Sequence, residues 1–156
     1  HGAQADGLYS QRDAKTLETW CATVRAHGIP VGVAGHAVET HRWVDSLNLV
    51  DFHTLCFFNC GSLHDGKGEK FRLRDVAPAA ETIRGIRKPC IAYKIMGAGR
   101  IDPKMALEFA LTSIKPTDVV NVGMHRGDKD NMVEENAATV REILEGAGRE
   151  PGGEHP

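Results

Sequence analysis

The chain has 156 residues, of which 41% are hydrophobic, so it is long and apolar enough to bury the core of one domain. Its 19 Lys and Arg residues against 21 Asp and Glu residues leave a net charge of −2 without a block of like charge, which argues against nucleic acid and membrane surfaces as partners. No apolar run approaches the roughly 18 residues of a membrane span and no signal peptide opens the chain, so we expect a cytoplasmic protein.

The first third of the chain predicts a helix, a strand and a second helix. After a polar loop, apolar residues recur at helical spacing within residues 10–27, with Ser10 and Asp13 placed to cap the helix start. Residues 29–35 are almost wholly apolar, as in a parallel strand buried on both faces. An amphipathic segment at residues 40–47 predicts the helix that follows.

The middle of the chain predicts a second strand, a long loop and a third helix. Residues 50–58 are again apolar enough to be buried on both sides of a sheet. Residues 59–74 are rich in Gly and charge, and a loop of this length is more often functional than idle. Asp75 is placed to cap a helix to about Ile86, with Ala79 and Ile83 toward the core.

The last third predicts two more strand and helix pairs. The strands are residues 90–96 and 119–122, and the helices are residues 103–114 and 131–145. Asp102-Pro103 is a strong helix start, because Asp accepts free amides and Pro has no amide hydrogen to satisfy. We therefore predict one domain over residues 1–146 and a flexible tail over residues 147–156.

The strand and helix order predicts an α/β protein with a parallel sheet. The predicted strands begin near residues 29, 50, 89 and 118, and their spacings bracket the roughly 31 residues per βα unit of a (β/α)8 TIM barrel. Four strands preceded by a strandless helix amount to half of such a barrel, with strands that correspond to the fifth through the eighth. A doubly wound open sheet fits the same order, but no GxGxxG turn follows the first strand.

The four cysteines predict no metal site and no disulfide framework. Cys21, Cys56, Cys60 and Cys90 lie in apolar stretches without the CxxC spacing of zinc sites, so we expect reduced and mostly buried thiols.

Several segments together resemble the aldo/keto reductases. Residues 123–136 (GMHRGDKDNMVEEN) are similar to the last βα unit of that family, in which a strand ends in Gly and the next helix contains a Glu-Asn pair. Residues 91–99 (IAYKIMGAG) look like the seventh strand of the family, residues 31–36 like the fifth and residues 50–59 like the sixth. The resemblance implies a half-barrel from the cofactor-binding end of an NAD(P)-dependent oxidoreductase.

The resemblance also implies where a nicotinamide cofactor would bind. In a barrel, the loops after the seventh and eighth strands commonly bind phosphate. Tyr93 would stack on the nicotinamide, and Glu135 and Asn136 would lie near the adenine. The cofactor-binding residues expected on this rim are His36, Asn59, Tyr93, Gly97, Gly99, Arg100, Gly123, Arg126, Glu135 and Asn136.

The catalytic machinery implied by the resemblance is incomplete. His1 falls where the fourth strand of the family places its catalytic His, whereas the catalytic Asp, Tyr and Lys would lie on strands that precede it. We therefore expect that this half-barrel alone does not reduce a small-molecule carbonyl substrate. It would need either a preceding half-barrel or a second copy of itself. The chain also departs from the family pattern at three places. It has Ala34-Gly35 where the family usually has Ser-Asn, Thr54 where the family has Gln, and Met132 where the family often has Arg.

Two other functions remain open from the residues. His1, His36 and His125 map to one rim and Lys94 ends an apolar strand, which suits a metal- or lysine-dependent isomerase or aldolase. A non-catalytic module that binds phosphate fits the same glycine-rich loops. Each residue also has an ordinary interpretation, in which His36 is a structural hydrogen-bonding group, Tyr93 packs between sheet and helix, and Lys94 pairs with an anion.

Overall fold

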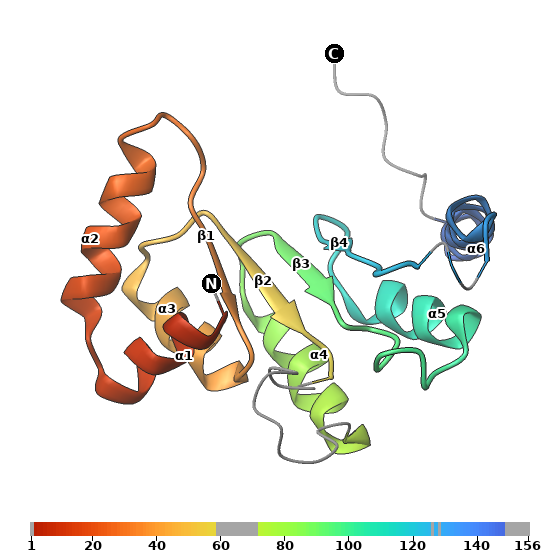
Figure 1. The fold of residues 1–156 in the computed structure, drawn as a ribbon, viewed down its shortest axis with the longest axis horizontal. Helices are drawn as coiled ribbons and strands as arrows, with labels where there is room; N and C mark the ends of the chain where they lie inside the picture. Colours follow the sequence, from red (N-terminus) through yellow and green to blue (C-terminus); the bar gives the residue numbers. More distant parts are fainter. Residues whose placement is uncertain (1, 59–71, 126, 128, 149–156) are drawn as a thin grey trace.

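A computed structural model describes residues 2–58, 72–125, 127 and 129–148. In these residues, four parallel strands form one sheet in the order β1-β2-β3-β4 (Figure 1). The strands are β1 (Gly32–Gly35), β2 (Phe52–Cys56), β3 (Cys90–Tyr93) and β4 (Val119–Val120). Each strand pairs with the next one in the sequence, so the predicted α/β class with a parallel sheet is confirmed.

The helices alternate with the strands, apart from two at the start of the chain. They are α1 (Gly2–Gln11), α2 (Ala14–Arg25), α3 (Val38–Leu47), α4 (Val76–Gly85), α5 (Pro103–Ser113) and α6 (Met132–Gly146), and a 3-10 turn, η2 (Leu73–Asp75), precedes α4. Asp102 caps α5 as predicted, because its carboxylate accepts a hydrogen bond from the Met105 amide at 3.0 Å.

Only one face of the sheet is fully buried. Val33, His53, Leu55 and Ala92 alternate along the strands toward α3, α4 and α5. The opposite face keeps part of its surface exposed. It is formed by Ala34, Phe52, Thr54, Ile91, Tyr93 and Val119. We call this set the open face. The predicted burial of residues 29–35 and 50–58 on both sides was wrong at Ala34, Phe52 and Thr54, whereas the consecutive residues 55–58 are all buried.

The core consists of two clusters along the sheet. One lies between β2, β3, α4 and α5, and it includes Leu55, Ile83, Ala92 and Leu107. The other joins α1, α2 and α3 to β1. Since no residue of α6 is fully buried, this last helix covers the molecule less tightly than α4 and α5 do.

The start of the chain differs from its predicted structure. Residues 2–11 are helical rather than a polar loop, and the helix predicted over residues 10–27 begins only at Ala14. Arg12 has a left-handed φ of 55° that separates α1 from α2, and Asp13 caps α2 by accepting the Thr16 amide at 3.0 Å. Helix α1 buries only Gly2, Ala5 and Leu8, and so few apolar residues give no clear periodicity.

Two aspartates close the amino-terminal edge of the sheet in the same way. Asp51 precedes β2 and accepts the Val31 amide at 2.7 Å, and Asp118 precedes β4 and accepts the Cys90 amide at 2.8 Å. Each carboxylate therefore fixes the start of the neighbouring strand. Asp118 also pairs with Lys115 at 2.7 Å, and its side chain is fully buried.

Candidate functional site

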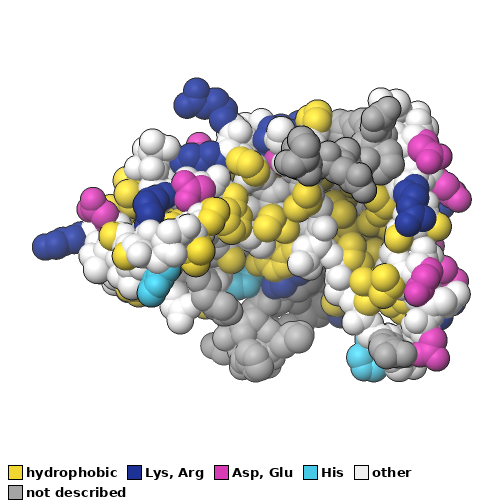
Figure 2. Space-filling view, turned by 90° about the horizontal axis from the view of Figure 1, so that it is seen from above, with side chains coloured by type: hydrophobic (Ala, Val, Ile, Leu, Met, Phe, Trp, Pro, Cys, Tyr) yellow, Lys and Arg dark blue, Asp and Glu magenta, His cyan; other side chains and the backbone are white. Residues whose placement is uncertain are grey.

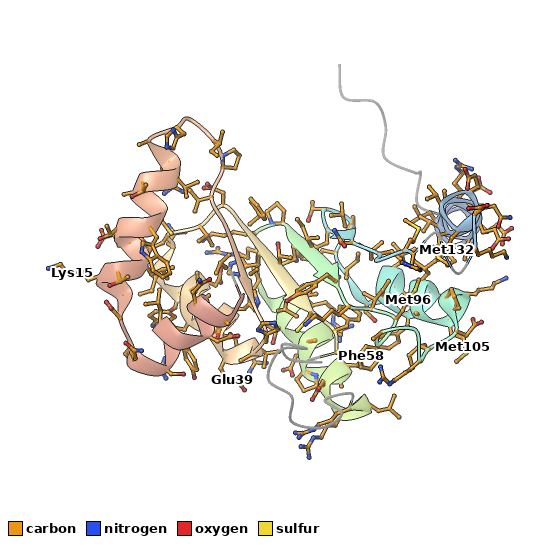
Figure 3. The ribbon with its side chains drawn as sticks, viewed as in Figure 1. Lys15, Glu39, Phe58, Met96, Met105 and Met132 are labelled. Carbon is orange, nitrogen blue, oxygen red and sulfur yellow. The ribbon has the colours of Figure 1, made fainter. Side chains whose placement is uncertain are left out.

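The polar residues that surround a cavity lie at the carboxyl edge of the sheet. In parallel α/β sheets this edge is where ligands bind, since the loops that leave the strands meet there. Glu39, at the start of α3, and Phe58, just after β2, are labelled near the ends of the strand arrows in Figure 3. The candidate site is formed by the residues that follow β1, β2 and β3.

Asp6 and His36 form a hydrogen-bonded pair at the end of β1. The Asp6 carboxylate accepts His36 Nδ1 at 2.9 Å, the His36 amide at 3.0 Å and the Thr40 hydroxyl at 2.7 Å. It also accepts the Ala37 amide at 3.3 Å. Because a carboxylate only accepts, the proton of a neutral His36 ring lies on Nδ1, and Nε2 has a lone pair to offer.

Hydrogen bonds keep Asp6 of this pair ionised, and packing holds the His36 ring in place. Burial by itself raises the pKa of Asp6, but hydrogen bonds from His36, Thr40 and two backbone amides outweigh it and lower the pKa to about 2. Asp6 is thus a carboxylate at neutral pH. A side chain at Gly2 would lie 2.7 Å from the His36 ring, so the backbone of α1 packs against the imidazole.

Two further histidines, His41 and His53, form a hydrogen-bonded pair in the core next to the site. His41 Nε2 donates to the Gly35 carbonyl at 3.3 Å, which leaves His41 Nδ1 to accept from His53 Nδ1 at 3.1 Å. Both rings are fully buried, and burial lowers the pKa of His41 to about 4 and that of His53 to about 3. His53 Nε2 lies 3.6 Å from Asp45, too far for a direct hydrogen bond.

Tyr93 and Cys56 adjoin the first pair from the next two strands. The Tyr93 hydroxyl donates to the Gly35 carbonyl at 3.4 Å, and the Cys56 thiol donates to the His36 carbonyl at 3.4 Å. Burial raises the pKa of Cys56 to about 11 and raises that of Tyr93 further above its ordinary value. Neither group is a ready anion at neutral pH.

Lys94 and the turn after it extend the edge beyond β3. Lys94 Nζ lies 5.5 Å from the centre of the Tyr93 ring, and Lys94 has a left-handed φ of 55°, which is rare for a residue with a side chain. Gly97 and Gly99 also have positive φ values, as the turn requires. The Arg100 guanidinium donates to the Gly97 carbonyl at 3.0 Å, which folds it onto this turn.

A cavity of about 300 Å³ opens beside His36. Its walls come from the end of β1, the start of α3, the end of β2 and the start of α4. The polar lining residues are His36, Glu39, Cys56, Arg74 and Asp75. This volume is at the small end of ligand sites in proteins.

The structure unites some of the predicted site residues and separates others. His36 and Tyr93 both contact the end of β1, and Lys94 adjoins Tyr93. Glu135 instead pairs with Lys129 and Asn131 on the exposed surface, and α6, which contains Glu135 and Asn136, packs against α5. A side chain at Gly123 would meet nothing within 4 Å. His1, Asn59 and Arg126 lie outside the described residues.

Sequence reasoning missed Asp6, His41 and His53. Asp6 lies in a segment predicted to be a polar loop, 30 residues before its partner, so no local pattern connects it with His36. His41 and His53 interrupt a helix stripe and an apolar strand, and a polar residue on a buried face requires a partner. The need for a buried partner was therefore the signal in the sequence that could have singled out His41 and His53.

Comparison with known proteins adds no family. No family model, curated protein or solved structure matches this chain. Within the described residues, no three His, Cys, Asp or Glu side chains gather closely enough to bind a metal ion. Helices in this part of the chain also lack the length and apolar character of a membrane span. The three buried thiols among the described residues, Cys21, Cys56 and Cys90, are free.

Proposed function

We propose that this chain is the carboxyl-terminal half of an aldo/keto reductase-like TIM barrel and forms the cofactor-binding part of an NAD(P)-dependent carbonyl reductase. The observation that carries the proposal is the strand order β1-β2-β3-β4 with polar groups at its carboxyl edge. Consecutive staves of a barrel follow one another in this way, whereas a doubly wound sheet reverses its order at a switch point. The helices that link the strands all pack on one face, as around a barrel.

The residues at this edge fit a nicotinamide ring better than a pyrophosphate. Tyr93 lies on the open face and offers an aromatic ring beside the strand ends. Arg100 could face a phosphate from the turn at Gly97 and Gly99, but the Asp102 carboxylate already occupies the start of α5. When bound, the nicotinamide would supply hydride to a carbonyl, and a proton donor would come from the other half-barrel.

Calorimetric titration with NADPH and NADH tests the proposal. We expect binding that Tyr93→Leu weakens by about tenfold, because loss of ring stacking removes about 1.4 kcal/mol. Tyr9→Leu is the matched control, since Tyr9 packs against Trp43 on the side of the molecule formed by α1 and α3. Absence of nucleotide binding, with or without an added amino-terminal half-barrel, would contradict the proposal. Binding without turnover under both conditions would favour the non-catalytic module.

A second candidate is a lysine-dependent isomerase or aldolase. The strained backbone of Lys94 at a strand end favours it, because strain of this kind concentrates at functional sites. Borohydride reduction in the presence of pyruvate or glycolaldehyde should then trap a covalent adduct that mass spectrometry locates on Lys94. Lys94→Met should abolish the adduct, and Lys104→Met on the exposed side of α5 should not. A metal-dependent isomerase or aldolase would require His1, which lies outside the described residues. Metal analysis of the purified protein tests this alternative.

A further inference from the structure

We propose that His36 is an acid–base residue for a small molecule with a hydroxyl or carbonyl group that binds in the adjoining cavity, and that Asp6 is its positioning residue. The proposal does not rest on the reductase function, because it uses neither a nicotinamide nor any residue of α6. It rests on the hydrogen bonds around Asp6, the packing of the imidazole and the cavity beside it.

The hydrogen bonds define which nitrogen reacts. Asp6 accepts Nδ1–H, so Nε2 is the atom that can take a proton. Among the described residues, no hydrogen bond engages Nε2, and the side chain is 19% exposed. When a bound hydroxyl group gives its proton to Nε2, the resulting imidazolium is stabilised by the adjacent carboxylate, and the proton returns from Nε2 in the reverse step.

The orientation of the imidazole is fixed before any ligand binds. Asp6 receives hydrogen bonds from the ring, from two backbone amides and from Thr40, so it has little freedom to rotate. The ring also packs closely against Gly2 of α1. The carboxylate that holds Nδ1 is thus itself held by three further groups, so the ring that borders the cavity is kept in one orientation.

The cavity lining indicates the class of molecule. Arg74 contributes one positive charge, and Glu39 and Asp75 contribute two negative charges, so the walls do not select strongly for an anion. Cys56 is a protonated thiol beside the ring rather than a competing nucleophile, because burial raises its pKa to about 11. A small, polar, uncharged molecule fits both the volume of about 300 Å³ and these charges.

Nitrogen-resolved NMR of the histidine rings tests the positioning role. We expect His36 to be mainly the Nδ1–H tautomer, which is the minor form of free histidine, and Asp6→Asn to reduce its population. Asp13→Asn is the matched control, because Asp13 also accepts two hydrogen bonds from a helix start but touches no histidine. A His36 ring protonated mainly on Nε2 in the unmodified protein would overturn the assignment of Asp6.

Hydrolysis of 4-nitrophenyl acetate tests the reactivity of Nε2. In this probe reaction the nitrogen attacks the acetyl carbon, 4-nitrophenolate leaves, and water then hydrolyses the acyl-imidazole. We expect a rate at least about tenfold above that of equimolar imidazole, lost in His36→Gln, lowered about tenfold in Asp6→Asn and unchanged in His27→Gln. Circular dichroism of each variant checks that the fold is retained.

A substitution that fills the cavity separates the role of the cavity from the role of the His36 ring. Val38 lines the cavity without bonding to Asp6 or His36, so Val38→Phe should lower the hydrolysis rate while the His36 tautomer stays the same. Equal rates for the unmodified protein and His36→Gln would overturn the acid–base role. An unchanged rate in Val38→Phe would overturn the role of the cavity. Neither result bears on nucleotide titration, so the two proposals fail separately.

Discussion

Gly35 is the residue at which the candidate site meets the core. A Cβ atom at this position would lie 3.1 Å from His41 Nε2, 3.3 Å from Asp6 Oδ1 and 3.3 Å from the Thr40 methyl group. These three neighbours are joined by hydrogen bonds to one another or to further buried groups, so none can move aside cheaply. The glycine is therefore required by packing rather than by an unusual φ.

We predict that Gly35→Ala destabilises the protein by about 1–3 kcal/mol, because overpacking exceeds the gain from a less flexible unfolded chain. Urea unfolding measures the change. Gly7→Ala is the control, since Gly7 lies in α1 with nothing within 4 Å, and it should stabilise by about 0.5–1 kcal/mol. Equal effects of the two substitutions would show that the contacts at Gly35 do not constrain it.

At the scale of elements, helix α3 is joined to β1 and β2 by polar contacts inside the core. His41 bonds to Gly35 and His53, and His53 faces Asp45, Lys88 and Lys115. Burial disfavours the charged form of each ring, and the neighbouring lysines add to this for His53. The packing of α3 therefore depends on two neutral imidazoles.

This dependence predicts a loss of stability in mild acid. The unfolded chain binds protons on both histidines near pH 6.5, whereas the folded protein resists them until about pH 4 and about pH 3. Stability is thus complete above about pH 7 and falls as the pH drops toward these values, by on the order of 4 kcal/mol at pH 5 for the pair. Asp6, with its pKa of about 2, stays ionised in this window and contributes only to a loss nearer pH 2 to 4.

Urea midpoints at pH 7 and pH 5 measure the effect. The double variant His41→Leu/His53→Leu should lose much less stability between the two pH values, because apolar residues of similar size replace both partners. His27→Gln, an exposed histidine, should keep the acid loss of the unmodified protein. If the double variant loses as much stability as the unmodified protein, other groups cause the acid sensitivity.

The sequence predicted the elements better than it predicted their ends. The four strands, the helices α3 to α6 and the cap at Asp102 follow from local patterns of apolar residues and capping groups. The strands are shorter than predicted, since an apolar run continues past the last paired residue. The polar contacts of Asp6, His41 and His53 join distant segments, and a single sequence contains no signal that pairs them.

At the scale of the whole molecule, the open face and the β4 edge leave apolar surface uncovered. Ile91 and Tyr93 are partly exposed there, Val119 is 55% exposed, and Gly32 leaves room for the Phe52 ring to lie across β1. Seen from above, which is along the strands rather than onto the open face, hydrophobic side chains also gather in the middle of the molecule between charged groups at its two ends (Figure 2). Periodicity could not reveal this face, because buried and half-exposed apolar strands read alike.

An uncovered apolar sheet face and an unpaired strand edge favour association, so we predict that the chain forms a dimer or larger oligomer in sedimentation velocity. Val119→Lys places a charge on the open face at its edge strand and should shift the protein toward monomer. Met105→Lys is the control, because Met105 is 66% exposed on α5, away from that face, and should leave the assembly unchanged. A dilute monomer with the sedimentation coefficient of a compact 17 kDa protein would mean that the open face is stable in water and needs no second half-barrel.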